Sequence, residues 1–174
     1  METPRNILPI RLWPDPVLGG KAKPVEAFTP ELAALAEQMI ETMYEADGVG
    51  LAAPQVGHAI RMFVADPRDE DERSPVVFVN PEIHLEGELD TLEEGCLSIP
   101  EIRVQVRRPG YARVKALDLE GNPFEVDSDD FPARVWQHEF DHLDGVLIID
   151  RMNPKDRLTN RKALKALKLA AEGS

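Results

Sequence analysis

The stretch FPARVWQHEFDHLDG, residues 131–145, predicts a helix that carries the chemistry of this chain. His138 and His142 are four residues apart, so on a helix their imidazoles share one face and can bind the same metal ion. Glu139 stands beside them, where it can handle a proton of water at that metal. The run therefore predicts metal-assisted hydrolysis, but it does not say which bond is cut.

Length and composition indicate a single globular domain, residues 1–174. The chain is long enough to bury a core, and 43% of its residues are apolar. A net charge of −12 argues against a general nucleic-acid binder, and no sequence-specific nucleic-acid contact is expected. We find no signal peptide and no segment long enough to span a bilayer. With one cysteine and hence no disulfide framework, the chain is expected in the bacterial cytoplasm, or in mature form in an organelle.

The order of helices and strands predicts an α+β fold. Prolines make residues 1–28 an irregular arm, and Thr29 followed by Pro30 predicts a helix start, with Gly48 as its stop. We expect mostly antiparallel strands packed around the central metal-binding helix, with an N-terminal and a C-terminal helix. A turn is predicted at Pro109-Gly110, and strands at 60–65, 75–79, 83–88, 103–106, 112–119 and 124–126.

The C-terminal segment is basic, although the chain as a whole is acidic. From Arg151 to Ser174 there are seven Lys or Arg and two Asp or Glu, a local charge of +5. Leucines recur among these charges, so residues 154–174 predict a basic amphipathic helix. Such a helix can be a docking element or simply a solvated surface, and the sequence leaves both readings open.

The third protein ligand of the metal has to come from outside the helix. In the longer metalloprotease run it would stand at Ile148, which cannot bind metal, and the only later glutamate is Glu172 near the end of the chain. Cys96 remains, next to Gly95, which lets the backbone approach closely. A Cys₁His₂ set leaves a position open for water, as a catalytic site requires. The alternative for Cys96 is a buried apolar thiol.

Three motifs occur in one order along the chain: GVGLAAPQ at 48–55, EGCLS at 94–98 and QHEFDHLDG at 137–145. In these motifs the chain resembles the peptide deformylases, which remove the formyl group from the N-terminal formylmethionine of new polypeptides. The resemblance spans roughly residues 5 to 153. A small H-E-x-x-H metallopeptidase and a non-catalytic metal-binding module stay as alternatives, but neither accounts for all three motifs.

The resemblance implies a single-metal hydrolase that acts on linear amides. Cys96, His138 and His142 would hold one divalent ion, natively Fe(II), with zinc, nickel or cobalt possible in purified protein. Hydroxide formed at the metal would attack the formyl carbonyl, with Glu139 as general acid/base, and formate would be released.

Further positions follow from the same resemblance. Gln55 and the backbone N–H of Leu97 would stabilise the oxyanion, and Gly50 would offer backbone hydrogen bonds to the nascent formylmethionyl polypeptide. Apart from the resemblance, the candidates to orient the ligands are Glu94, Arg103, Gln137 and Asp141, the last by accepting from an imidazole. In some deformylases a C-terminal helix docks on the ribosome, and no membrane contact is expected. The methionine needs an apolar pocket, and four apolar residues that flank the motifs could line it or could equally be plain core: Val49, Leu92, Phe131 and Val135.

Overall fold

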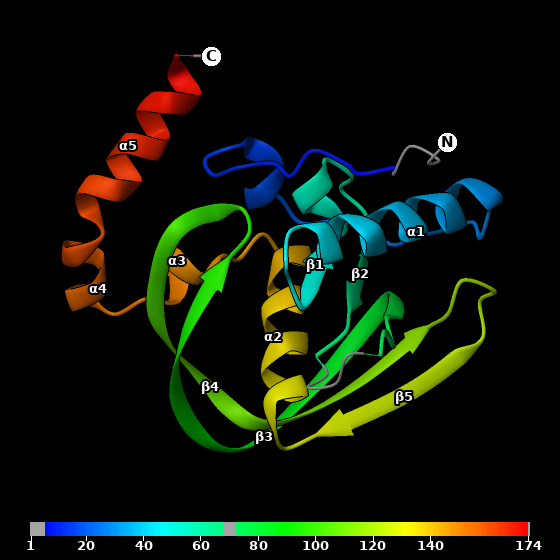
Figure 1. The fold of residues 1–174 in the computed structure, drawn as a ribbon. Helices are drawn as coiled ribbons and strands as arrows, with labels where there is room; N and C mark the ends of the chain where they lie inside the picture. Colours follow the sequence, from blue (N-terminus) through cyan, green and yellow to red (C-terminus); the bar gives the residue numbers. More distant parts are fainter. Residues whose placement is uncertain (1–5, 68–71, 174) are drawn as a thin grey trace.

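An antiparallel sheet encloses helix α2 (Phe131–Leu143). The computed structural model describes residues 6–67 and 72–173, and within them five strands lie in the order β1-β2-β3-β4-β5. Figure 1 shows the long β3–β4 hairpin curving around α2. The predicted α+β fold, with antiparallel strands around the metal-binding helix, is confirmed. The strands are β1 (Gly50–Ala52), β2 (Met62–Ala65), β3 (Val76–Cys96), β4 (Ile99–Leu117) and β5 (Pro123–Ser128).

Helix α1 (Pro30–Glu45) begins where the sequence predicts. The Thr29 hydroxyl accepts a hydrogen bond from the Leu32 N–H at 3.2 Å, which satisfies one of the free N–H groups of the first turn. The helix ends before Gly48. The shorter helices are η1 (Pro16–Gly19), η2 (Ala53–Val56) and α3 (Ile148–Arg151). No helix in residues 6–67 or 72–173 is long and apolar enough to cross a membrane.

The core fixes α2 against the sheet. Phe63 of β2 stacks on Phe78 of β3 with ring centroids 4.6 Å apart, and Trp136 of α2 packs 6.3 Å from Phe78. A second cluster joins α1 to β1 and β2 through Met39 and Met43, both fully buried. Because the first cluster is buried and contains Trp136, it holds α2 in one position relative to the strands.

The predicted turn at Pro109-Gly110 is wrong. Both residues lie inside β4, and Pro109 is paired with Leu89 of β3. The register of β3 shifts between Glu86 and Leu89, and Gly87 within this shift has a φ of 92°. Within the described strands, β5 pairs with β4 only at 112–117, so the outer edge at Pro109 has no partner strand, and such an edge accepts a proline. The strands predicted at 75–79 and 83–88 are one strand, as are those at 103–106 and 112–119.

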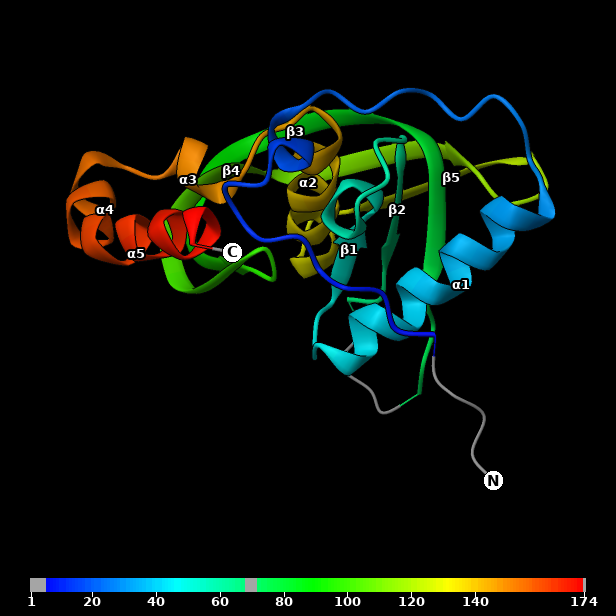
Figure 2. The same cartoon turned by 90° about the horizontal axis from the view of Figure 1, so that it is seen from above.

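The C-terminal segment consists of two helices, where the sequence predicted one over 154–174. Helices α4 (Pro154–Thr159) and α5 (Arg161–Glu172) are separated by Asn160, whose ψ of 6° departs from helical geometry. Figure 2 shows both at the end of the molecule opposite to α1. Ser174, and residues 1–5 of the predicted irregular arm, lie outside the described residues; in the rest of the arm the only helix is η1.

Candidate metal centre

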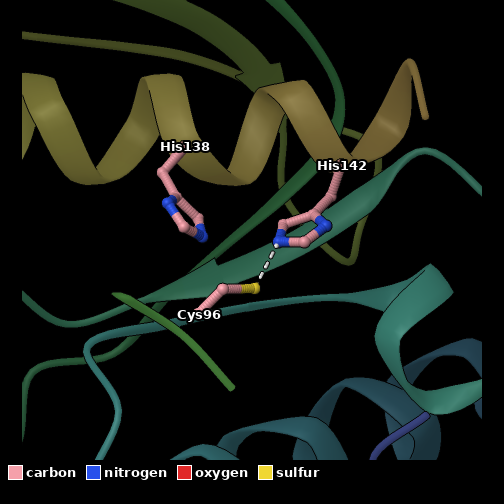
Figure 3. Close-up of side chains that lie close together, drawn as sticks. All are labelled: Cys96, His138 and His142. Atoms are coloured by element: carbon pink, nitrogen blue, oxygen red, sulfur yellow. Dashed lines mark hydrogen bonds between the residues drawn. The ribbon is translucent and has the colours of Figure 1, made fainter. Parts of the chain in front are cut away.

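Cys96, His138 and His142 converge between the hairpin and α2. Their ligand atoms all lie within 4.8 Å of one another, and Cys96 Sγ is 3.5 Å from His142 Nε2 (Figure 3). The two imidazoles project from one face of α2, as their spacing predicts, with ring centroids 5.1 Å apart. The structure thus brings together the three residues that the sequence singled out. Two imidazoles and one thiol form a donor set that leaves a position open on a tetrahedral metal.

The hairpin places Cys96 opposite the helix. Cys96 is the last residue of β3 and pairs with Ile99, the first residue of β4, so the chain reverses through Leu97 and Ser98. Cys96 also packs against the apolar cluster that contains Ile99 and Ile102. The thiol is therefore held by a tight turn and by its packing in this cluster.

A carboxylate orients one of the histidines. Glu94 Oε1 lies 3.0 Å from His138 Nδ1, which leaves Nε2 of that ring to face the cluster. Metal-binding histidines commonly carry such a partner, because it fixes the tautomer and the ring orientation. Burial would raise the pKa of Glu94, but hydrogen bonds from His138 and Arg108 outweigh it and hold the pKa well below its usual range. Of the three other candidates, Asp141 pairs with Arg108 and Arg151 instead of an imidazole. Arg103 pairs with Glu93, and Gln137 donates to the carbonyl of Pro109.

The charges around the cluster fit a bound cation. Burial lowers the pKa of His142, which keeps this ring neutral and able to donate a lone pair. At His138 burial acts in the same direction, but the charge of Glu139 and contacts with Cys96 and Glu94 outweigh it and raise the pKa. The negative groups that raise the pKa of His138 also favour a cation at this position. Donor atoms and local field therefore both fit a metal.

Glu139 is buried beside the ligands and is 4% exposed. Burial raises its pKa to about 7, and its Oε1 has no hydrogen-bond partner in the described structure. A carboxyl group with a pKa near neutrality is suited to both accepting and returning a proton. The backbone of Gly50 lies directly against it: a Cβ at position 50 would stand 2.5 Å from Glu139 Oε2.

The amide of Gln55 has a fixed orientation. Its Oε1 accepts from the Ala52 N–H at 3.0 Å, so its Nε2 must point the other way. There Nε2 donates to Ser98 Oγ at 3.1 Å and approaches Cys96 Sγ at 3.7 Å. One amide N–H is thus held next to the metal cluster, where a donor to a developing oxyanion is needed.

A cavity of about 840 Å³ opens at the cluster. Gln55, His138 and Glu139 line it, whereas His142 is only 1% exposed and lies behind them. Large apolar side chains left open to solvent in a cavity are typical of a ligand pocket. The other residues predicted to contact substrate or oxyanion line the same cavity, namely Gly50, Val49, Leu92, Leu97, Phe131 and Val135.

Three residues that support the site were missed by sequence reasoning. Ser98 holds Gln55, and Arg108 and Arg134 both donate to Glu94. A signal for Arg108 is present in the strand pattern: Ile102, Val104 and Val106 alternate with polar residues, and the arginine takes the next inward position. An arginine in an apolar register requires a buried anion, which the sequence alone could not locate.

Comparison with known proteins agrees with this geometry. Residues 7–158 match the model of the polypeptide deformylase family. The peptide deformylase of Thermotoga neapolitana is 48% identical over 165 residues, covering 94% of this chain and 98% of that protein. The crystal structure of the Thermotoga maritima enzyme is 50% identical with a TM-score of 0.80, over 85% of this chain and 99% of that one. The Synechococcus elongatus enzyme, solved in complex with actinonin, is 40% identical with a TM-score of 0.87, over 95% and 90%. The chain therefore belongs to the polypeptide deformylase family, and it is an enzyme that removes the formyl group from the N-terminal formylmethionine of newly synthesised polypeptides.

Proposed function

We propose that the deformylase carries out its reaction at the cluster of Cys96, His138 and His142, which together hold its single metal ion. A divalent metal at this position supplies Lewis acidity and makes water acidic enough to lose a proton near neutral pH. The convergence of the three donor atoms, with Cys96 and His138 lining the cavity, is the observation that carries the proposal.

Glu139 handles the proton in this scheme. Its carboxylate takes a proton from the attacking water and later delivers it to the nitrogen of the departing methionine, while the other product is formate. The free Oε1 and the pKa near 7 support both steps, because the group exchanges a proton readily at neutral pH.

Gln55 and Leu97 stabilise the negative oxygen that develops on the formyl carbon. The Nε2 of Gln55 is held in place before substrate arrives, so no reorganisation is needed during the reaction. The backbone N–H of Leu97, directly after the metal ligand Cys96, is the second donor in this proposal. Its side chain lines the same cavity.

The nascent peptide lies along β1, with its methionine in the apolar part of the cavity. Within the described sheet β1 pairs only with β2, so its second edge is free to pair with an extended chain. Gly50 offers backbone hydrogen bonds on this strand. The methionine side chain contacts Val49, Leu92, Phe131 and Val135, of which the first three are 40%, 46% and 46% exposed.

We further propose iron(II) as the native metal, with zinc, nickel or cobalt able to replace it in purified protein. The donor set does not select one of these ions by itself, because a thiolate with two imidazoles suits several of them.

Relatives that share about half of their residues with this chain are bacterial, which supports a bacterial cytoplasmic enzyme. We treat residues 1–174 as one deformylase domain.

The C-terminal helices are our candidate for ribosome contact. Lys162, Lys165 and Lys168 are exposed on α5, and Leu169 is 57% exposed beside them. Leu164 and Leu167 pack against the apolar cluster below, so the helix presents its basic face outward. A basic face of this kind suits an anionic surface such as ribosomal RNA.

The decisive experiment measures formate release from a formyl-Met-Ala-Ser peptide, with metal content determined in parallel. We expect formate in proportion to bound iron(II) or nickel. No formate from fully loaded protein would refute the proposed site. The control is a peptide whose N-terminus is blocked by a group other than formyl. Cleavage of an internal peptide bond in this control would indicate a peptidase.

A further inference from the structure

A buried arginine extends the metal site beyond its ligands. The Arg108 side chain is 3% exposed, and its Nε and Nη2 donate to the two oxygens of Glu94 at 2.7 and 3.0 Å. Glu94 in turn lies 3.0 Å from His138 Nδ1. A continuous chain of charge-assisted hydrogen bonds therefore connects the arginine to a proposed metal ligand.

The remaining guanidinium nitrogen of Arg108, Nη1, also has a charged partner. It donates to Asp141 Oδ2 at 2.9 Å, and Asp141 is also bound by Arg151 at 2.6 and 2.8 Å. Asp141 belongs to α2 and Arg151 to α3, so the arginine of β4 is clamped between the hairpin and the helix that carries both histidines.

We propose that Arg108 is a positioning residue for the metal centre, which acts through Glu94 to fix the ring of His138 toward the metal. The proposal rests on the metal-binding role of His138 proposed above. A carboxylate has two oxygens and can rotate, and a single hydrogen bond from His138 would not determine its plane. The paired donors of a guanidinium do, because their spacing matches the two oxygens.

Lysine cannot replace this function, although it preserves the charge. Its ammonium group is a point donor without the planar fork, so it neutralises Glu94 without setting the plane of the carboxylate. Arg134 also donates to Glu94 Oε2 at 2.6 Å, but through one nitrogen only; its other nitrogen donates to the carbonyl of Asp90. Of the two arginines, Arg108 alone contacts both oxygens of Glu94.

The test is the zinc affinity of metal-free protein, measured by competition with a coloured chelator. We expect R108K to bind zinc about 10–100-fold more weakly than the wild type, the range typical when the partner of a metal ligand is disturbed. R151K is the matched control, since it alters an arginine of the same network that touches Asp141 but not Glu94. Its zinc affinity should equal that of the wild type.

Each outcome has a distinct meaning. Equal zinc affinity of folded R108K and wild type would overturn the positioning role, and a lower melting temperature alone would then mark Arg108 as structural. An equal loss in R151K would also overturn it. Failure of the wild type to bind zinc would instead overturn the proposed ligand set.

A second pair of variants covers the case in which R108K does not fold. E94Q removes the charge through which Arg108 acts, and E94Q/R108Q removes both charges of the pair. If Arg108 works only through Glu94, the double variant binds zinc as E94Q does, because the two changes break one connection. A further loss of affinity in the double variant would contradict the proposal.

Discussion

Gly50 and Glu139 are close neighbours in the lining of the cavity, and a side chain at position 50 would occupy the space of the Glu139 carboxylate. A Cβ there would lie 2.5 Å from Oε2 and 2.8 Å from both Cδ and Cγ. Since Glu139 is buried, it has little room to withdraw. The neighbouring carboxylate thus requires a glycine at position 50.

We expect G50A to displace Glu139 and to lower kcat by about 10²-fold, because a shift near 1 Å in a reacting group has an effect of this size. Metal content should remain that of the wild type, since no ligand is touched. The measurement is formate release together with metal analysis. Unchanged kcat would show that Glu139 tolerates the displacement, and loss of metal would show that the change spreads to the ligands.

Replacement of Glu139 by glutamine should separate proton transfer from metal binding. E139Q keeps the shape of the side chain but can no longer take a proton, so kcat should fall by about 10²–10⁴-fold. Metal stoichiometry should stay at the wild-type value. Retained turnover in E139Q would remove Glu139 from the mechanism.

Loss of the thiol should weaken the metal site itself. C96A leaves only His138 and His142 as protein ligands, so we expect metal to be lost during dialysis that the wild type survives. H58A, which removes an exposed histidine outside the cluster, is the control and should keep its metal. Full metal occupancy in C96A would mean that the third ligand is assigned wrongly.

Gln55 can be tested by a change that keeps its bond to the backbone of Ala52. Q55E preserves the oxygen that accepts from the Ala52 N–H but lacks the N–H directed toward Cys96. Removal of one oxyanion donor lowers kcat by about 10²–10³-fold, and we expect a fall of this order. S98A removes the hydroxyl that holds the Gln55 amide but leaves the amide N–H in place. The fall in kcat should therefore be smaller in S98A than in Q55E. A Q55E enzyme as active as S98A would exclude Gln55 as a donor.

Charge reversal on α5 should test the ribosome contact without removing the helix. K162E/K165E changes two exposed lysines and leaves Leu164 and Leu167 packed against the cluster below. We expect co-sedimentation with ribosomes to be lost at moderate salt while deformylation of a free peptide is unchanged. The control is K21E/K115E, which makes the same change of charge elsewhere on the surface and should still co-sediment with ribosomes. Equal co-sedimentation of both variants would refute the docking role.

Local features of the chain could be predicted because neighbouring residues decide them. The cap at Thr29 and the shared face of His138 and His142 depend only on helix geometry, and both are found in the structure. The course of β4 through Pro109 could not, because it depends on which strand lies alongside. From the sequence alone a proline predicts a turn, and only the position of the neighbouring strands shows that it can lie at a strand edge. The break at Asn160 was also missed, although its hydrogen bonds to Asp156 and Leu158 are local.

The sequence by itself determined that two imidazoles and a carboxyl group would project from one helix, since a spacing of four residues is nearly one turn. It also indicated Cys96 as the third donor, but it had no means to bring the thiol to the helix. Only the tertiary structure decided this, through the turn of the β3–β4 hairpin and its packing around α2. The same packing buried Arg108 against Glu94, because a charge in the interior is stable only where another chain segment supplies its counter-charge.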